Sequence, residues 1–224
     1  MPRFRLTQTA AGCQLEEQLS RQKPLLIDFN SGPLQHRRLH GGRKELLLKA
    51  VAARPGRHVV DCTAGLGVDA FLMAANGCTV TLLERSPVLA LLLADALRRG
   101  QQDPQIAAVI GRMALVQVEA CSWLAALQEP TDSIYIDQMF PQPQKSAAVK
   151  GGMQLLQKFL GHDGEVSGLL QAALATNSQR VIVKRPLVGG ETPGLVPDYQ
   201  LKARASRFDI YVRGGKAAQA LGSI

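Results

Sequence analysis

The sequence lacks the features of membrane-spanning, secreted and metal-binding chains. No apolar run approaches the ~18–20 residues of a transmembrane helix. No apolar h-region follows the basic residues after Met1, so we expect no secretory signal. The four cysteines lie far apart, without a Cys-x-x-Cys pair or a histidine at metal-ligand spacing. These absences argue against a disulfide framework, a membrane partner and a metal site, and they favour a cytoplasmic location.

What is present is the composition of an ordinary globular domain. The chain has 224 residues, of which 46% are hydrophobic and 20% charged, so it can fill a core without disulfides or metals. We expect residues 56–224 to form the main domain and residues 1–55 to form an N-terminal, β-containing extension packed on it.

Positive charge is in excess and clustered. The formal net charge is +8, with seven basic residues and one acid between Gln35 and Arg57, and eight basic residues and three acids from Arg180 onward. Such clusters predict a polyanionic partner. A basic surface without a partner is the alternative.

Short apolar runs alternate with helical patterns from about residue 58, which predicts βαβ units and a mostly parallel sheet. Strands are expected at 4–8, 25–29, 58–62, 78–83, 114–118, 133–136 and 180–184, and an antiparallel C-terminal hairpin at 199–205 and 207–212. Helices are expected at 44–53, 68–76, 88–99, 145–160 and 165–176, with a shorter one from about 103 and a turn at 30–33.

A glycine-rich turn follows the strand at 58–62. Gly65 and Gly67 let the backbone approach a ligand, and the helix that follows offers unpaired N–H groups. Glu84 ends the next strand, where a carboxylate can accept hydrogen bonds from both ribose hydroxyls of a nucleoside cofactor. Gly65-x-Gly67-x-x-Ala70 also satisfies the dinucleotide fingerprint. A tight turn without a ligand is the alternative.

Two acids beside this turn distinguish between the possible cofactors. Asp61 ends the strand before the turn, and Asp69 lies in the first turn of the helix after it. Their charges would repel a pyrophosphate but attract the ammonium and sulfonium groups of S-adenosylmethionine, which is therefore favoured over NAD. Complementarity to the helix dipole is the alternative role for each acid.

The segment Asp137-Gln138-Met139-Phe140-Pro141 follows the strand at 133–136. It resembles the Asp/Asn-Pro-Pro-aromatic motif of methyltransferases that modify exocyclic amino groups. In that motif the acid accepts hydrogen bonds from the target NH2, and the aromatic ring stacks on the flipped base. Asp137 and Phe140 are therefore the candidate catalytic residues, expected beside the glycine turn at the carboxyl edge of the sheet. A loop-capping Asp137 and a core Phe140 are the alternative.

As a whole, the chain resembles the small-subunit ribosomal RNA guanine-N2 methyltransferase J family. The matching stretches include His36-Arg37-Arg38, Asp61-x-Thr63-Ala64-Gly65-Leu66-Gly67-x-Asp69, Leu83-Glu84-Arg85, Asp137-x-Met139-Phe140-Pro141, Val183-Lys184-Arg185-Pro186 and Arg207-Phe208-Asp209. The resemblance implies an α/β, Rossmann-like class I methyltransferase fold and transfer of a methyl group from S-adenosylmethionine to a guanine N2 of 16S rRNA in the small ribosomal subunit. It places cofactor contacts on Val68, Asp69, Glu84, Arg85, Ser122, Trp123 and Asp137. Gln138 stands where the family has proline.

Basic residues around the predicted site are candidates for contact with RNA phosphates. Arg37 and Arg38 lie in a predicted glycine-flanked loop, and arginine pairs bidentately with phosphate. Lys145, Lys184 and Arg185 are expected on the same edge, as a rim around the active site. A solvated basic loop is the alternative for residues 36–38, and a core position is the alternative for Trp123.

Two other functions are compatible with parts of the sequence. An NAD-dependent oxidoreductase fits the glycine spacing, but it leaves residues 137–141 unexplained and lacks an evident hydride-relay His or Tyr-x-x-x-Lys. A non-catalytic RNA-binding protein on the same fold gains weight from Gln138. The oligomeric state is open.

Phe140→Ala separates stacking from packing. If the ring stacks on the target guanine, the substitution removes about 1–3 kcal/mol of stacking and slows methyl transfer by roughly 5–150-fold, with little change in melting temperature. If Phe140 belongs to the core, about 3–5 kcal/mol of stability is lost instead. A stable, cofactor-binding variant with the wild-type transfer rate on small-subunit RNA would contradict the stacking role.

Overall fold

The structure is a computed structural model, and it describes residues 4–41, 45–137, 155, 159 and 166–215. Phe140, Lys145 and nearly all of the helix expected at 145–160 lie outside the described residues.

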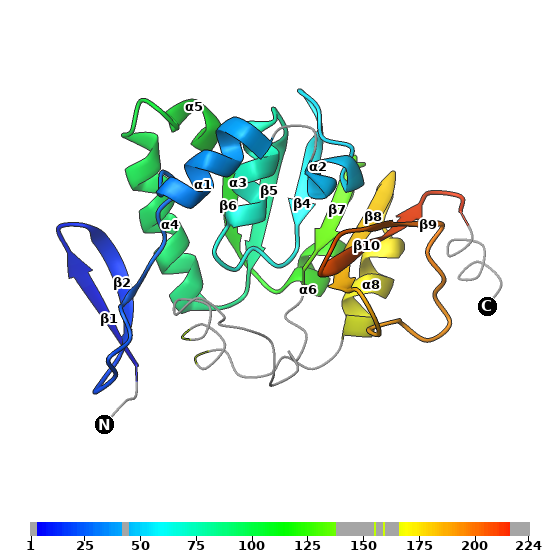
Figure 1. The fold of residues 1–224 in the computed structure, drawn as a ribbon. Coiled ribbons are helices and arrows are strands. Elements are labelled where there is room, and N and C mark those ends of the chain that lie inside the picture. The colour runs from blue at the N-terminus through cyan, green and yellow to red at the C-terminus, as the bar shows by residue number, and fades with distance from the viewer. Residues whose placement is uncertain (1–3, 42–44, 138–154, 156–158, 160–165, 216–224) are drawn as a thin grey trace.

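Within the described residues, a seven-stranded sheet forms the centre of the molecule, in the order β6-β5-β4-β7-β8-β10-β9 (Figure 1). Its strands are β4 (His58–Asp61), β5 (Thr79–Glu84), β6 (Met113–Gln117), β7 (Ser133–Ile136), β8 (Arg180–Pro186), β9 (Tyr199–Lys202) and β10 (Ser206–Val212). Strands β4 to β8 pair in parallel, and β10 is antiparallel to both of its neighbours. The mostly parallel sheet and the C-terminal hairpin are therefore confirmed.

The strand order reverses between β4 and β7. From β4 the chain first adds β5 and β6 on one side, and it then returns to add β7 and β8 on the other. Ligands of open parallel sheets bind at the carboxyl ends of the strands beside such a reversal. In this chain that point lies where Asp61 ends β4 and Asp137 follows β7.

Successive residues of the central strands face two different helical layers. Val59 and Ile182 belong to one buried cluster, and their neighbours Val60 and Val183 belong to the other. The strands therefore bury both faces, which explains their near-continuous apolar runs.

Two groups of helices cover the sheet. The first cluster includes residues of α1 (Gly32–His36), α2 (Leu46–Ala50), α3 (Val68–Ala75), α4 (Pro87–Gln101) and α5 (Ala107–Ile110), and the second includes residues of α6 (Ala120–Ala125) and α8 (Val166–Leu174). Helix α4 starts as expected, with the Ser86 Oγ accepting a hydrogen bond from the Leu89 N–H and proline at the first helical position. Among the described helices, none is both long and apolar enough to cross a membrane.

The turn expected at 30–33 includes only residue 30, and residues 32–33 and the loop expected at 36–38 are helical. Helix α1 continues into a π-helical turn, η1 (Arg37–Gly41). Pro33 does not break this segment, because proline is tolerated in the first turn of a helix, where the missing N–H has no helical partner.

The N-terminal residues form a separate antiparallel sheet of β1 (Phe4–Thr9), β2 (Gly12–Glu17) and β3 (Leu25–Leu26). The sequence did not predict β2. This strand packs near α4, where Cys13 N donates to Asp95 Oδ2 at 2.9 Å, and Figure 1 shows the hairpin beside that helix. The division into a 1–55 extension and a 56–224 domain stays a prediction.

A matched pair of leucines tests how firmly this sheet is anchored. Leu15 and Leu6 are directly paired across β1 and β2, but Leu15 is 1% exposed and Leu6 36%. Leu15→Ala should lower the free energy of unfolding by about 2–5 kcal/mol, and Leu6→Ala by about 1 kcal/mol or less. Urea titrations measure both. Equal small losses would show that the sheet contributes nothing to the common core.

Candidate functional site

The turn between β4 and α3 depends on glycine at two positions. Gly65 and Gly67 have left-handed backbones, with φ values of +54° and +70°. A Cβ atom at Gly67 would lie 2.9 Å from Leu93 Cδ2 and 3.0 Å from Phe29 Cζ. Conformation and packing therefore both require glycine at position 67.

Glu84 holds this turn against the end of β5. Its Oε2 accepts a hydrogen bond from Gly65 N at 3.0 Å, and its Oε1 accepts one from Ser86 N at 2.8 Å. The residue is 7% exposed. Each carboxylate oxygen can accept more than one hydrogen bond, so the contacts to Gly65 N and Ser86 N are compatible with ribose binding by Glu84.

Asp61 is buried among other acids. Its Oδ1 accepts a hydrogen bond from Thr63 N at 3.1 Å. Burial raises the pKa of Asp61 to about 8, and the Thr63 hydrogen bond opposes this shift only in part. The charges of Asp69, Asp137 and Glu84 act in the same direction as burial. Without a bound cation, Asp61 is therefore largely protonated at neutral pH.

Asp69 and Asp137 share one lysine. Lys184 Nζ lies 2.7 Å from Asp137 Oδ2 and 3.1 Å from Asp69 Oδ2. The Tyr135 hydroxyl also donates to Asp69 Oδ2, at 2.7 Å. Asp137 N donates to Thr63 Oγ1 at 2.7 Å, so the residue after β7 is tied to the glycine turn. As the sequence predicts, Asp137 lies beside this turn.

The register of the sheet explains this meeting. Ile136 of β7 pairs with Val183 of β8. Asp137 and Lys184 follow by one residue on each strand and are therefore neighbours. Side chains alternate along a strand, so both face the same layer as Tyr135, which packs in the cluster containing α3.

Helix α6 adds a further wall near the second cluster. Glu119 caps this helix by accepting hydrogen bonds from Cys121 N and from Ser122 N and Oγ. Burial would raise the pKa of Glu119, but these hydrogen bonds outweigh it and lower that pKa. Trp123 is half-buried against the second cluster, which supports a packing role.

Comparisons with known proteins show the family to which the chain belongs. The model of a family described as SAM-dependent methyltransferases matches residues 2–213. A ribosomal RNA small subunit methyltransferase J from Dechloromonas aromatica is 46% identical over 192 residues, which cover 84% of this chain and 78% of that protein. The chain belongs to the methyltransferase J family.

A second methyltransferase J relative is similarly close, and one solved structure shares the fold. The Aeromonas hydrophila protein is 44% identical over 223 residues, covering 97% of this chain and 90% of that protein. A crystal structure of a SAM-dependent methyltransferase from Neisseria gonorrhoeae has a TM-score of 0.74 at 34% identity, covering 94% of this chain and 83% of that one.

The residues of the turn fit the cofactor of this family, S-adenosylmethionine. Glu84 offers acceptors for its ribose, Asp69 is a negative partner for its positive groups, and Asp61 can lose its proton when a cation binds beside it. Val68 opens α3, half-buried, and Arg85 and Ser122 are exposed. Within the described ranges, no cluster of His, Cys, Asp or Glu could hold a metal ion.

The two arginines expected to contact RNA already have protein partners in this structure. Arg37 pairs bidentately with Glu45, through Nε at 3.0 Å and Nη2 at 2.9 Å, and this contact raises the pKa of Arg37. The Arg38 Nη1 donates to the Gln105 carbonyl at 3.2 Å. Both side chains stay partly exposed, on helical turns rather than on a loop.

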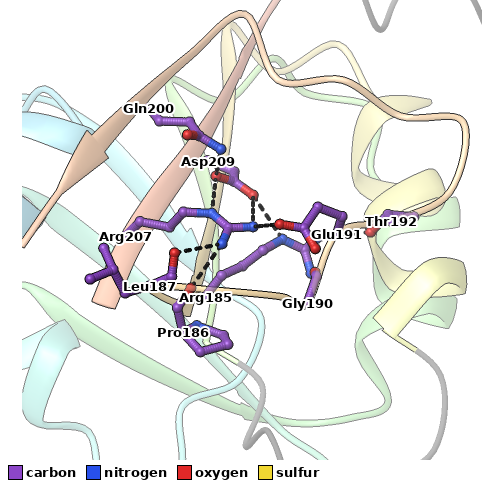
Figure 2. Close-up of polar contacts among 9 residues, drawn as sticks. All are labelled: Arg185, Pro186, Leu187, Gly190, Glu191, Thr192, Gln200, Arg207 and Asp209. Carbon is purple, nitrogen blue, oxygen red and sulfur yellow. Dashed lines mark hydrogen bonds and ion pairs between the residues drawn. The ribbon is translucent and has the colours of Figure 1, made fainter. Parts of the chain in front are cut away.

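Arg185 does not lie on the expected exposed rim. It is 2% exposed, with its Nε 3.0 Å from Asp209 Oδ2, and its Nη2 donates to Thr192 Oγ1 at 2.6 Å. Figure 2 shows Arg185 beside Arg207, whose Nε donates to Asp209 Oδ1 and whose Nη2 donates to Asp209 Oδ2. Neighbouring strand residues point to opposite faces, so Lys184 and Arg185 cannot line one rim.

Three contributors were missed by the sequence interpretation: Thr63, Tyr135 and the lysine at 184 as a partner of acids. Two signals could have found Tyr135 and Lys184. Tyr135 is two residues before Asp137 on a buried strand, and a buried phenol needs a hydrogen-bond partner. Lys184 follows three apolar residues of a buried strand, where lysine is rarely left unpaired.

The raised pKa of Asp61 predicts a pH-dependent cost to folding. Above the ordinary value of 3.8, the unfolded carboxyl is ionised while the folded one keeps its proton up to about pH 8. Rising pH in this window therefore favours unfolding, by up to about 1.4 kcal/mol per pH unit. Asp61→Asn should gain stability over wild type progressively from pH 5 to pH 8 in urea titrations without cofactor.

Glu129→Gln is the matched control, because Glu129 is exposed. An exposed substitution of this kind should change the free energy of unfolding by no more than about 0.5 kcal/mol. A constant difference for Asp61→Asn over the same range would show that Asp61 is ionised in the folded protein.

Proposed function

We propose that this protein transfers a methyl group from S-adenosylmethionine to the exocyclic N2 of a guanine in the 16S rRNA of the small ribosomal subunit. The observation that carries the proposal is the Asp137 carboxylate beside the glycine turn, in a chain that belongs to the methyltransferase J family. A ribosomal RNA substrate is consistent with the net charge of +8 and with a cytoplasmic location.

The chain binds its cofactor along the carboxyl edge of β4 and β5. Glu84 accepts hydrogen bonds from the ribose hydroxyls, and Asp61 and Asp69 face the ammonium and sulfonium groups of the cofactor. When bound, S-adenosylmethionine supplies an electrophilic methyl group, which moves to the nitrogen while the electrons of the broken C–S bond stay with sulfur. Half-buried Asp69 lies beside buried Asp61, and two acids at this position favour a cation, which supports this cofactor over NAD.

Asp137 orients the target. Its carboxylate accepts a hydrogen bond from the guanine amino group and aligns the nitrogen lone pair with the methyl carbon. The nitrogen is positively charged once the new C–N bond has formed, and it loses a proton to the Asp137 carboxylate or to water. Positioning of the two reactants supplies much of the rate. The hydrogen bond between Asp137 N and Thr63 fixes the carboxylate relative to the cofactor turn.

RNA binds through basic side chains outside the sheet edge. Arg37 and Arg38 remain candidates because both are partly exposed and arginine can exchange a surface carboxylate for a phosphate. Phe140 and Lys145, which follow Asp137 in the sequence, are proposed for stacking on the base and for contact with phosphate. Arg185 is omitted from this surface because it is buried.

Single-turnover transfer of a labelled methyl group to small-subunit RNA tests the proposed function. Wild type with S-adenosylmethionine should label guanine N2, and NAD should neither react nor raise the melting temperature. Absence of any transfer to naked RNA or to small-subunit particles would leave the non-catalytic RNA-binding protein as the better account.

Glu84→Ala tests the cofactor site separately. Loss of charge-assisted hydrogen bonds to the ribose should weaken S-adenosylmethionine binding by roughly 10–150-fold in calorimetry. An analogue without the 2′-hydroxyl is the control: it should bind wild type less tightly than the parent cofactor does, and the variant should distinguish the two far less. Affinities of wild type and variant within twofold of each other would exclude the role.

A further inference from the structure

Lys184 is the residue that joins the two halves of the site. Its ammonium contacts Asp69, at the start of α3 beside the cofactor turn, and Asp137, the proposed partner of the target nitrogen. The two carboxylates come from different parts of the chain: the Tyr135 hydroxyl donates to the Asp69 carboxylate, and the Asp137 backbone N–H donates to Thr63 Oγ1. Lys184 therefore links the two carboxylates, and its loss would remove this link.

Partial burial of the Lys184 ammonium costs free energy unless the charge is paired with acids. The side chain is 30% exposed, on a strand whose neighbours Val183 and Ile182 are fully buried. Burial would lower the pKa of Lys184, but the charges of Asp69 and Asp137 outweigh burial and raise it. The ammonium stays protonated wherever the enzyme works, so Lys184 is a fixed positive charge rather than a proton donor.

Asp137 needs such a charge because of what surrounds it. Burial raises the pKa of Asp137, the positive charge of Lys184 lowers it, and Asp69 raises it again. Asp61 of β4 and Tyr135 of β7 face the same space. Two other groups belong to this electrostatic neighbourhood: Glu84 of β5 acts on Asp61, and Arg37 of η1 is coupled to Asp69 and Tyr135.

We propose that Lys184 is a positioning residue, which holds the Asp137 carboxylate for the target amino group and ties it to Asp69 of the cofactor turn. The proposal rests on the proposed function of Asp137. It replaces the interpretation of Lys184 as an RNA-phosphate contact. Lys184 Nζ donates a hydrogen bond to Asp137 Oδ2, and Thr63 Oγ1 accepts one from the Asp137 backbone N–H. Together these contacts orient the carboxylate before the guanine binds.

The first test is the pH profile of single-turnover transfer for Lys184→Met and Lys184→Arg. Without the ammonium, Asp137 should take up a proton more readily. The fall in the transfer rate constant on the acid side of the pH profile should therefore move to higher pH. Near pH 7 we expect a loss in kcat of about 10–100-fold, the scale of a misplaced reactive group. Arginine keeps the charge and should restore the position of the acid limb and part of the rate.

The second readout separates positioning from RNA binding. A positioning role lowers kcat and leaves the KM for RNA and the salt dependence of RNA binding unchanged. Lys202→Met is the matched control, because Lys202 is an exposed lysine on β9. A raised KM with a flatter salt dependence and an unchanged kcat for Lys184→Met would overturn the proposal in favour of a phosphate contact.

The third readout needs neither RNA nor cofactor, so it separates failure of this proposal from failure of the proposed function. Urea titrations of wild type, Lys184→Met, Asp137→Asn and the double variant form a double-mutant cycle. We expect a favourable coupling that grows as pH rises and Asp137 ionises. A coupling near zero at all pH values would overturn the proposal even if wild type methylates RNA. A coupling of the expected sign together with no methyl transfer by wild type would show that the Lys184–Asp137 ion pair exists, but it would overturn the positioning role proposed for Lys184.

Discussion

Repulsion among carboxylates is the constraint around which the carboxyl edge of this sheet is organised. Asp61, Asp69, Asp137 and Glu84 come from four different elements and influence one another. The structure reduces this repulsion in three ways: Asp61 keeps a proton, backbone N–H groups bind Glu84, and Lys184 pairs with the remaining two. The edge retains a bias toward positively charged ligands, as a sulfonium cofactor requires.

The central sheet could be predicted from the sequence because its strands are buried on both faces. Ser133–Ile136 and the start of β8 appear as short apolar runs, and the glycine turn marks the point where β4 meets α3. The neighbourhood of Asp137 and the turn followed from the rule that parallel strands share a carboxyl edge. These are local patterns combined with one rule of topology.

The elements that were missed have weaker local patterns. Strand β2 has the sequence Gly-Cys-Gln-Leu-Glu-Glu, in which Leu15 is the only strongly apolar residue, so no alternating apolar pattern marks it as a strand. Its structure depends on pairing with β1 and on contact with α4. Pro33 favours a turn as readily as the first position of α1. The adjacent basic residues at 184 and 185 look alike in a sequence, but one strand sends them to opposite layers with different partners.

The opposite orientation of Lys184 and Arg185 makes β8 sensitive to its own register. Lys184 meets the carboxylates of the site, while Arg185 meets Asp209 on the other face. A shift of one residue in this strand would present the arginine to the site and leave the lysine against Asp209. A single insertion inside the strand, between its N-terminal end and Lys184, would therefore remove both ion pairs at once.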